Sequence, residues 1–261
     1  MVNVDLLVLI LIISSALLYL LSAVSLFMKK QLLGNIFLGA GWLLGIALFA
    51  VNWIYVGYPP FANMYHVLTF LSLCFLPLYL ILALREKMYW LLPYFCIASM
   101  LPLIGVLFME RQVIWELPPA LQSLWFVPHV LSYMISYAMA AVAFILTIAS
   151  SLKANSGEQE RFSKAVYQVL RLGFPFMTIG LFLGAIWAEE AWGTYWSWDT
   201  KETWSLITWT LYLLYFHSLR SKVHKKMAKT FQICAFAALL VTFLMVNLMP
   251  QLGSILHSYT K

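Results

Sequence analysis

The sequence predicts an all-α polytopic membrane protein with about eight transmembrane helices and short interfacial helices. Of its 261 residues, 63% are apolar and 10% are charged, and the apolar runs repeat at lengths near the roughly 20 residues that a helix needs to cross a bilayer. A soluble core has no room for so many uninterrupted apolar stretches. Residues 1–261 are therefore expected to form a single integral membrane domain.

Eight apolar segments are expected to span the membrane, with ends set by charged and turn-forming residues. They are residues 4–27, 33–53, 65–84, 89–108, 126–152, 172–187, 203–219 and 231–249. The first lacks the basic region and cleavage site of a secretory signal, so we expect it to be retained as a span. The polar residues 154–161 are expected to form a flexible loop, and residues 109–128 a short interfacial helix.

The basic residues are concentrated in alternate connections between the predicted spans. Thirteen of the sixteen Lys and Arg residues fall on one side, and only Arg111, Lys201 and Lys261 fall on the other. By the positive-inside rule the basic side is cytoplasmic, so the positive net charge reflects topology and nucleic-acid binding is not expected. Both termini are expected outside, together with the segments 57–66, 109–128, 187–204 and 250–261.

The tryptophan-rich segment, residues 187–209, holds six tryptophans and five charged side chains. Indole rings offer flat, rigid faces that suit a membrane surface and equally suit a planar apolar ligand. Glu189 and Glu190 are adjacent on the chain and so do not face each other as an acid–base pair would. The acidic residues are expected to hold the segment in shape. Lys201 and Arg111 are the natural partners for anionic groups on an outer ligand.

The five histidines are the next candidates for chemistry. His129 and His257 lie outside and flank the tryptophan-rich segment in sequence, which suits two axial ligands of a porphyrin iron and equally suits two interfacial polar residues. His217, near the inner end of the seventh span, is either a functional residue or one that reaches the headgroups. His66 fits a structural or a functional role. His224 lies in a lysine-rich inner loop, where we expect a solvated side chain rather than a ligand.

Other reaction types find little support in the sequence. It contains no Gly-rich phosphate loop, no Gly-x-Ser-x-Gly elbow and no His-Glu-x-x-His helix. Cys74, Cys96 and Cys234 each lie alone within an apolar run, so neither a disulfide framework nor a Cys-x-x-Cys motif is expected.

Residues 192–204, Trp-Gly-Thr-Tyr-Trp-Ser-Trp-Asp-Thr-Lys-Glu-Thr-Trp, resemble the WWD signature of the haem-handling proteins of cytochrome c maturation. The Lys-Glu-Thr ending is similar to the CcsA (ResC) type. Asn63-Met64-Tyr65 is similar to the Asn-Met-Tyr segment of that family, although His66 follows it where many relatives carry an acidic residue. The resemblance covers the chain from about residue 59 onward, and includes the positions of two outer histidines and one membrane histidine.

The resemblance implies that haem b is carried to the outer face, held there between His129 and His257, and presented to the CxxCH segment of an apocytochrome c. It implies that His217 ligates haem at an inner site, opposite a ligand from a CcsB (ResB) partner. Two cysteine thiols then add across the haem vinyl groups, which requires positioning and reduced iron rather than an acid–base pair. The cofactor-binding residues expected besides the histidines are Trp192, Trp196, Trp198, Asp199, Lys201, Glu202 and Trp204, with His66 and Arg111 as further candidates.

The implied protein is a haem lyase of the bacterial plasma membrane or a thylakoid membrane, active on the extracytoplasmic face with a CcsB-type partner and thiol-reducing proteins. One alternative is haem delivery of the CcmC type, to a chaperone without ligation. The eight spans, the Lys-Glu-Thr ending and His217 argue against it. A second alternative is an ion-coupled transporter, but the predicted spans contain almost no other charge to form a relay.

Overall fold

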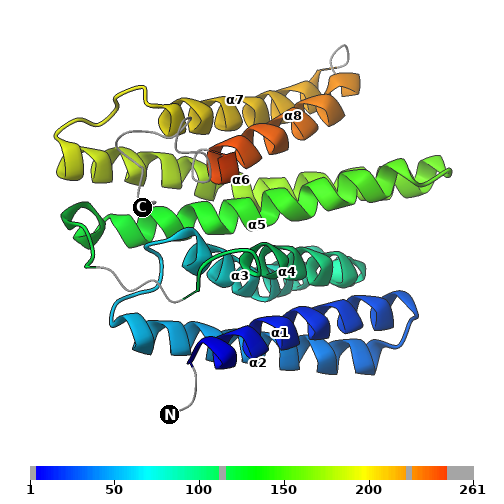
Figure 1. Cartoon of the computed structure of the whole chain (residues 1–261). Helices are drawn as coiled ribbons and strands as arrows, with labels where there is room; N and C mark the ends of the chain where they lie inside the picture. Colours follow the sequence, from blue (N-terminus) through cyan, green and yellow to red (C-terminus); the bar gives the residue numbers. More distant parts are fainter. Residues whose placement is uncertain (1–3, 112–115, 222–224, 246–261) are drawn as a thin grey trace. The chain divides into compact units, whose positions relative to one another are not determined.

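The structure, a computed structural model, describes residues 4–111, 116–221 and 225–245. Within them the chain is all-α, as predicted, and it contains no strand (Figure 1). The helices are α1 (Val4–Phe27), α2 (Gln31–Val56), α3 (Met64–Glu86), α4 (Leu92–Val106), α5 (Phe126–Ser151), α6 (Ser156–Trp192), α7 (Thr200–Arg220) and α8 (Ala228–Leu240). Short 3-10 turns lie at Tyr89–Leu91, Pro119–Gln122 and Lys225–Met227, and a π-helical turn, Val241–Met245, continues α8.

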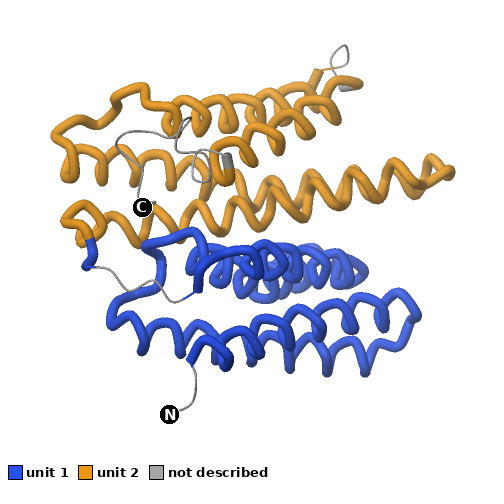
Figure 2. The backbone as a smooth tube through the Cα atoms, in the orientation of Figure 1, with its two compact units in different colours: residues 1–117 blue, residues 118–261 orange. Residues whose placement is uncertain are grey.

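The chain divides into two compact units, which Figure 2 shows in different colours. Unit 1, Met1–Leu117, contains the first four helices, and consecutive helices run antiparallel (Figure 1). Helix α1 packs on α2 and α4, and α3 packs on the same two, so each helix of unit 1 has two neighbours. Tyr19, Phe75 and Phe95 are at most 2% exposed and form the centre of this core.

Unit 2, Pro118–Lys261, contains the last four helices in a similar arrangement. Helix α5 runs along α6, α7 along α8, and α5 also contacts α8. Helix α6 has 37 residues and is therefore about 55 Å long, far more than the roughly 30 Å of a bilayer core. It is long enough to extend beyond the bilayer core, and it carries the start of the tryptophan-rich segment. The end of that segment is tied to α6, because Trp209 Nε1 donates to Thr178 Oγ1 at 3.0 Å.

Six helices in the described residues are long and apolar enough to cross a membrane: α1, α2, α3, α4 with the turn before it, α5 and α6. The chain is therefore an integral membrane protein. Helix α7 has 21 residues and begins with the polar run Thr200–Thr203, and α8 with its π-helical turn is apolar over Ala228–Leu244. Their assignment as the seventh and eighth spans stays a prediction, as do the outer location of the termini and the single membrane domain.

Two local predictions are wrong. Residues 156–161, expected in a flexible loop, form the first turns of α6, because Asn155 accepts a hydrogen bond from the Gly157 N–H at 2.8 Å and caps the helix. Of the interfacial helix expected over residues 109–128, the residues described before α5 contain only the 3-10 turn Pro119–Gln122. Pro118 has an extended backbone, with ψ of 145°. Because a proline has no backbone N–H, Pro118 and Pro119 cannot donate helical hydrogen bonds to the residues that precede them.

Candidate functional site

Trp187, the first residue of the tryptophan-rich segment, is the centre of an aromatic cluster in unit 2. It is 2% exposed, and its Nε1–H donates to the Ala120 carbonyl oxygen at 2.7 Å. Its ring lies 5.5 Å from that of His129, at an interplanar angle of 25°, and 4.7 Å from that of Trp192. Trp187 therefore connects the predicted outer ligand His129 to the tryptophan-rich segment.

His129 lies in the first turn of α5, and its imidazole has a defined orientation. Its Nδ1 is 2.9 Å from the Gly180 carbonyl oxygen of α6. A carbonyl only accepts, so Nδ1 carries the proton and Nε2 carries the lone pair. Metal-ligating histidines commonly have this arrangement, in which one nitrogen donates to a carbonyl and the other faces the metal. The Tyr133 ring lies 5.1 Å from the imidazole and nearly perpendicular to it.

The C-terminal end of α6 is attached to residues 119–125 by a second polar contact. Ser123 Oγ donates to Glu190 Oε2 at 2.6 Å, and the Trp125 N–H donates to Ser123 Oγ at 3.1 Å. Together with the bond from Trp187 to Ala120, this contact joins the start of α5 to the end of α6. Glu190 thus serves to hold the segment in shape.

Between α6 and α7 the chain is fixed by backbone caps. Gly193, with φ of 75°, ends α6 in the left-handed conformation and its N–H donates to the Glu189 carbonyl. Asp199 begins α7 with a capping box, because its side chain accepts from the Glu202 N–H and Glu202 accepts from the Asp199 N–H. Glu202 Oε2 also accepts from the Ser197 N–H at 2.8 Å and from Ser197 Oγ at 3.1 Å. These carboxylates therefore form a frame for the segment, as the sequence suggested.

The frame holds two aromatic rings in an unusual state. Trp198 has φ of 59° and is 68% exposed, although a bulky residue rarely adopts a left-handed backbone and a large apolar ring is rarely left in solvent. Thr203 Oγ1 donates to the Trp198 carbonyl at 3.2 Å, which helps to stabilise this conformation. The Trp196 ring lies 5.8 Å from Trp198, and its Nε1 is buried without a hydrogen-bond partner among the described residues. Strained and unsatisfied groups of this kind are typical of ligand sites.

Lys201 and Trp204 lie in the first turns of α7, where the sequence placed them, and both are partly exposed. His217 lies near the other end of α7, exposed on the helix surface. Its Nδ1 is 2.8 Å from the Leu213 carbonyl oxygen, so Nε2 again carries the lone pair. The ring faces away from the core of unit 2.

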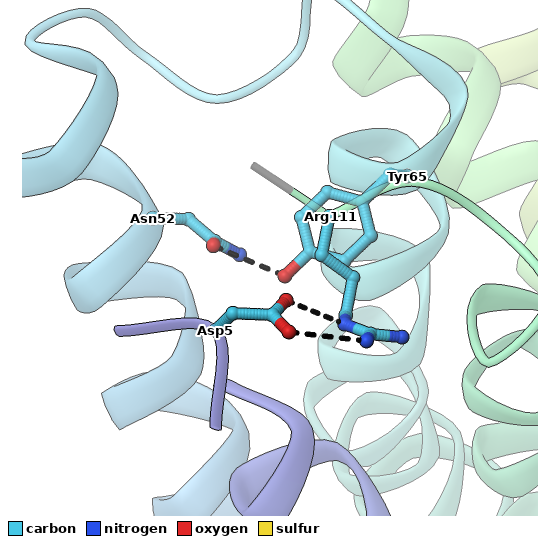
Figure 3. Close-up of polar contacts among 4 residues, drawn as sticks. All are labelled: Asp5, Asn52, Tyr65 and Arg111. Atoms are coloured by element: carbon cyan, nitrogen blue, oxygen red, sulfur yellow. Dashed lines mark hydrogen bonds and ion pairs between the residues drawn. The ribbon is translucent and has the colours of Figure 1, made fainter. Parts of the chain in front are cut away.

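Two further candidates, Arg111 and His66, belong to unit 1. Arg111 Nε lies 3.0 Å from Asp5 Oδ1, and Nη2 lies 3.4 Å from Oδ2, so its charge is matched by a carboxylate. The hydrogen bonds of that pair raise the pKa of the guanidinium. Beside this pair, the Tyr65 hydroxyl donates to Asn52 Oδ1 at 3.1 Å, and Figure 3 shows the four side chains pointing toward one another. His66 is 1% exposed, and its Nδ1 has no hydrogen-bond partner among the described residues.

The structure brings together some of the predicted site residues and not others. His129, Trp187 and Trp192 form one cluster in unit 2, while Arg111 and His66 lie in unit 1. The predicted ligand His257 lies outside the described residues, as does His224. Among the described residues no three His, Cys, Asp or Glu side chains gather to bind a metal ion, but haem iron needs only axial ligands from the protein.

Three residues of this site were not expected from the sequence. Trp187 was counted only as part of the aromatic segment, and Gly180 and Gly184 were not singled out at all. The spacing of four between the two glycines, with Trp187 three residues further on, places all three on one face of α6. That spacing was the available signal, although it does not reveal which side chain of α5 lies opposite.

Comparison with known proteins identifies the family. Residues 61–253 match the family model described as cytochrome C assembly protein. The chain is 38% identical over 251 residues to the cytochrome c biogenesis protein CcsA of Chlamydomonas reinhardtii, covering 89% of this chain and 69% of that protein. It is 32% identical to the CcsA of Trieres chinensis, with 80% of each chain covered, and 31% identical to that of Synechococcus elongatus, with 82% of each covered.

These matches extend across both units and include the tryptophan-rich segment, the caps that frame it and the helix start that carries His129. The chain therefore belongs to the cytochrome c assembly protein family, as a CcsA-type member with a role in cytochrome c biogenesis.

Proposed function

We propose that the chain is the haem-handling subunit of a cytochrome c synthetase. It moves haem b to the outer face of the membrane and presents it to the CxxCH segment of an apocytochrome c, where the thioether bonds form. The orientation of His129 carries this proposal. A proton on Nδ1, held by the Gly180 carbonyl at 2.9 Å, leaves Nε2 as the nitrogen that binds iron.

The tryptophan-rich segment forms one wall of the outer site in this proposal. Trp198 and Tyr195 are 68% and 61% exposed, and they offer flat apolar surface to a porphyrin. The buried Nε1–H of Trp196 is a donor for an anionic or carbonyl oxygen of the haem or of a neighbouring segment. Lys201, in the first turn of α7, supplies positive charge for a propionate. Asp199 and Glu202 do not contact haem in this proposal; they hold the tryptophan-rich segment in the conformation that forms this wall.

The outer iron has His129 and His257 as its axial ligands, and the inner iron has His217. An imidazole exposed on the surface of α7, with its lone pair on Nε2, suits a haem shared with a second protein. The opposite ligand is supplied by a CcsB-type partner. The name CcsA of the relatives supports this assignment over haem delivery of the CcmC type.

The reaction asks the protein for positioning. In each addition the thiol sulfur bonds to one vinyl carbon and the thiol proton goes to the neighbouring carbon, so nothing is released. The chain holds the porphyrin plane against the aromatic wall, keeps both axial positions filled and excludes water from one face. The lyase activity belongs to the complex with the CcsB-type partner, supported by thiol-reducing proteins and reduced iron.

The site faces the extracytoplasmic side of a bacterial plasma membrane or a thylakoid membrane. The thirteen basic residues on the other side of the predicted spans support this orientation. The outer face is then formed by residues 57–66, 109–128, 187–204 and 250–261 of one membrane domain.

The proposal is tested by purifying the full chain with its CcsB-type partner and recording absorption spectra of wild type, His129→Ala and His257→Ala. The wild type should show a low-spin, six-coordinate haem, and each variant should lose haem or become high-spin, with partial rescue by added imidazole. Unchanged spectra in both variants would contradict the proposed ligands. Absence of haem from the wild-type complex would contradict haem handling altogether.

A further inference from the structure

The imidazole of His129 rests in a notch on α6 that exists because residue 184 is a glycine, and the Tyr133 ring lies in the same way against Gly180. A Cβ atom added at Gly184 would lie 2.6 Å from His129 Cε1 and 2.8 Å from Nδ1. One added at Gly180 would lie 3.0 Å from Cδ2 of Tyr133. The first two distances are shorter than any real contact of a Cβ atom, so an alanine at position 184 requires the ring to move.

The notch also has a hydrogen-bond acceptor and a stacking surface. The Gly180 carbonyl accepts from Nδ1 at 2.9 Å, which sets the tautomer. The Trp187 ring stacks 5.5 Å from the imidazole and is itself fixed by its bond to the Ala120 carbonyl, which sets the ring plane. Gly184, the Gly180 carbonyl and the Trp187 indole thus define the position, the protonation and the plane of one imidazole.

Close helix packing alone does not account for this arrangement. Gly173, seven residues before Gly180 on the same face of α6, has an equally tight contact with α5, since its added Cβ would lie 2.6 Å from Met139 Cβ. That contact is between apolar side chain and backbone. At Gly184 the equally close contact is with the His129 imidazole, a side chain whose Nε2 carries a lone pair.

We propose that Gly184, Gly180 and Trp187 are positioning residues for the outer haem ligand, and that they hold His129 with Nε2 directed at the iron. The inference rests on the proposed role of His129 as an axial ligand. Positioning groups around a metal-bound histidine commonly change metal affinity by about 10–100-fold. An alanine at position 184 should therefore weaken the outer haem nearly as much as loss of His129 itself.

The experiment compares Gly184→Ala with Gly173→Ala, in the full chain purified with its CcsB-type partner. Both variants add one methyl group to the same face of α6 and push equally on α5, but only the first touches His129. Per mole of purified protein, the low-spin signal of the outer haem should fall about tenfold or more in Gly184→Ala and should recover in part with added imidazole. Gly173→Ala should keep the wild-type spectrum.

Two further variants separate the possible failures. If His129→Ala loses the signal while Gly184→Ala keeps it, positioning is wrong and the ligand assignment stands. If His129→Ala keeps the signal, the ligand assignment fails and the inference with it. Equal losses in Gly184→Ala and Gly173→Ala would show that both glycines serve only helix packing, and would overturn the proposal.

If Gly184→Ala does not accumulate, the variant Trp187→Leu tests the proposal instead, because it removes the stacked ring without adding atoms to the notch. An altered low-spin spectrum is expected, and an unchanged one would overturn the proposal.

Discussion

The two units contain the same number of helices in similar arrangements, yet they use the polar groups at their predicted outer ends differently. In unit 1 Asp5 pairs with Arg111 and Tyr65 donates to Asn52 (Figure 3), so these groups join α1 to the segment after α4 and α3 to α2. In unit 2 a bulky ring at Trp198 is exposed in a left-handed conformation, and His129 is seated with a defined tautomer. Groups that satisfy each other stabilise a fold, whereas strained or exposed groups are available to a ligand.

This difference predicts separate consequences for substitutions in the two units. Replacing the exposed or strained side chains of unit 2 should alter haem binding at little cost in stability, and replacing the paired side chains of unit 1 should alter stability with little effect on haem.

The largest effect is expected from His217→Ala, because haem that does not enter the inner site does not reach the outer one. Most of the haem should be absent from the purified complex, as measured by its absorption per mole of protein. The control is Arg220→Gln, an exposed residue one turn further along α7, which should retain normal haem. Normal loading of His217→Ala would contradict the inner role of this histidine.

Trp198→Ala should reduce haem affinity by about tenfold or more, the equivalent of about 1.5–3 kcal/mol for the burial of a large aromatic side chain against the porphyrin. Because Trp198 is exposed, the melting temperature should change little. The matched control is Trp53→Ala in unit 1, where the ring is 46% exposed. Haem titration of both variants checks this prediction, and equal affinities would show that the Trp198 ring does not contact haem.

Glu202→Ala removes the acceptor shared by Ser197 and Asp199. Loss of a helix cap costs about 0.5–2 kcal/mol, and residues 197–199 should lose their fixed conformation, so that haem affinity falls several-fold. Asn155→Ala removes the cap at the other end of unit 2 and should cost similar stability without loss of haem. The comparison fails if thermal melts and haem titrations of the two variants are alike.

The smallest effect is expected from Arg111→Gln. A partly exposed ion pair contributes at most about 1 kcal/mol, so the melting temperature should fall by a few degrees at most. The haem spectrum should remain that of the wild type, and Asp5→Asn should behave in the same way. Loss of haem from Arg111→Gln alone, with an unchanged melting temperature, would instead assign Arg111 to the ligand.

The helices were largely predictable because long apolar runs are bounded by charges and turn residues. The extension of α6 was not, since Ser156–Arg161 is polar and only the cap at Asn155 indicates a helix. Within the site, the spacing Asp199-x-x-Glu202 predicts a capping box and hence the frame of the tryptophan-rich segment. The notch was not predictable, because it depends on which face of α6 meets α5. The pairing of Asp5 with Arg111, 106 residues apart, depends on tertiary structure in the same way.

The central claim is that His129 Nε2 binds the outer haem iron, and it is tested most directly by exchanging that ligand. In His129→Met, purified with the CcsB-type partner, a thioether sulfur replaces the imidazole at the same position of α5. A His/Met ligand pair raises the reduction potential of haem relative to two histidines. We therefore predict a higher potential and an altered low-spin spectrum for the outer haem. A potential and spectrum identical to those of the wild type would contradict the account.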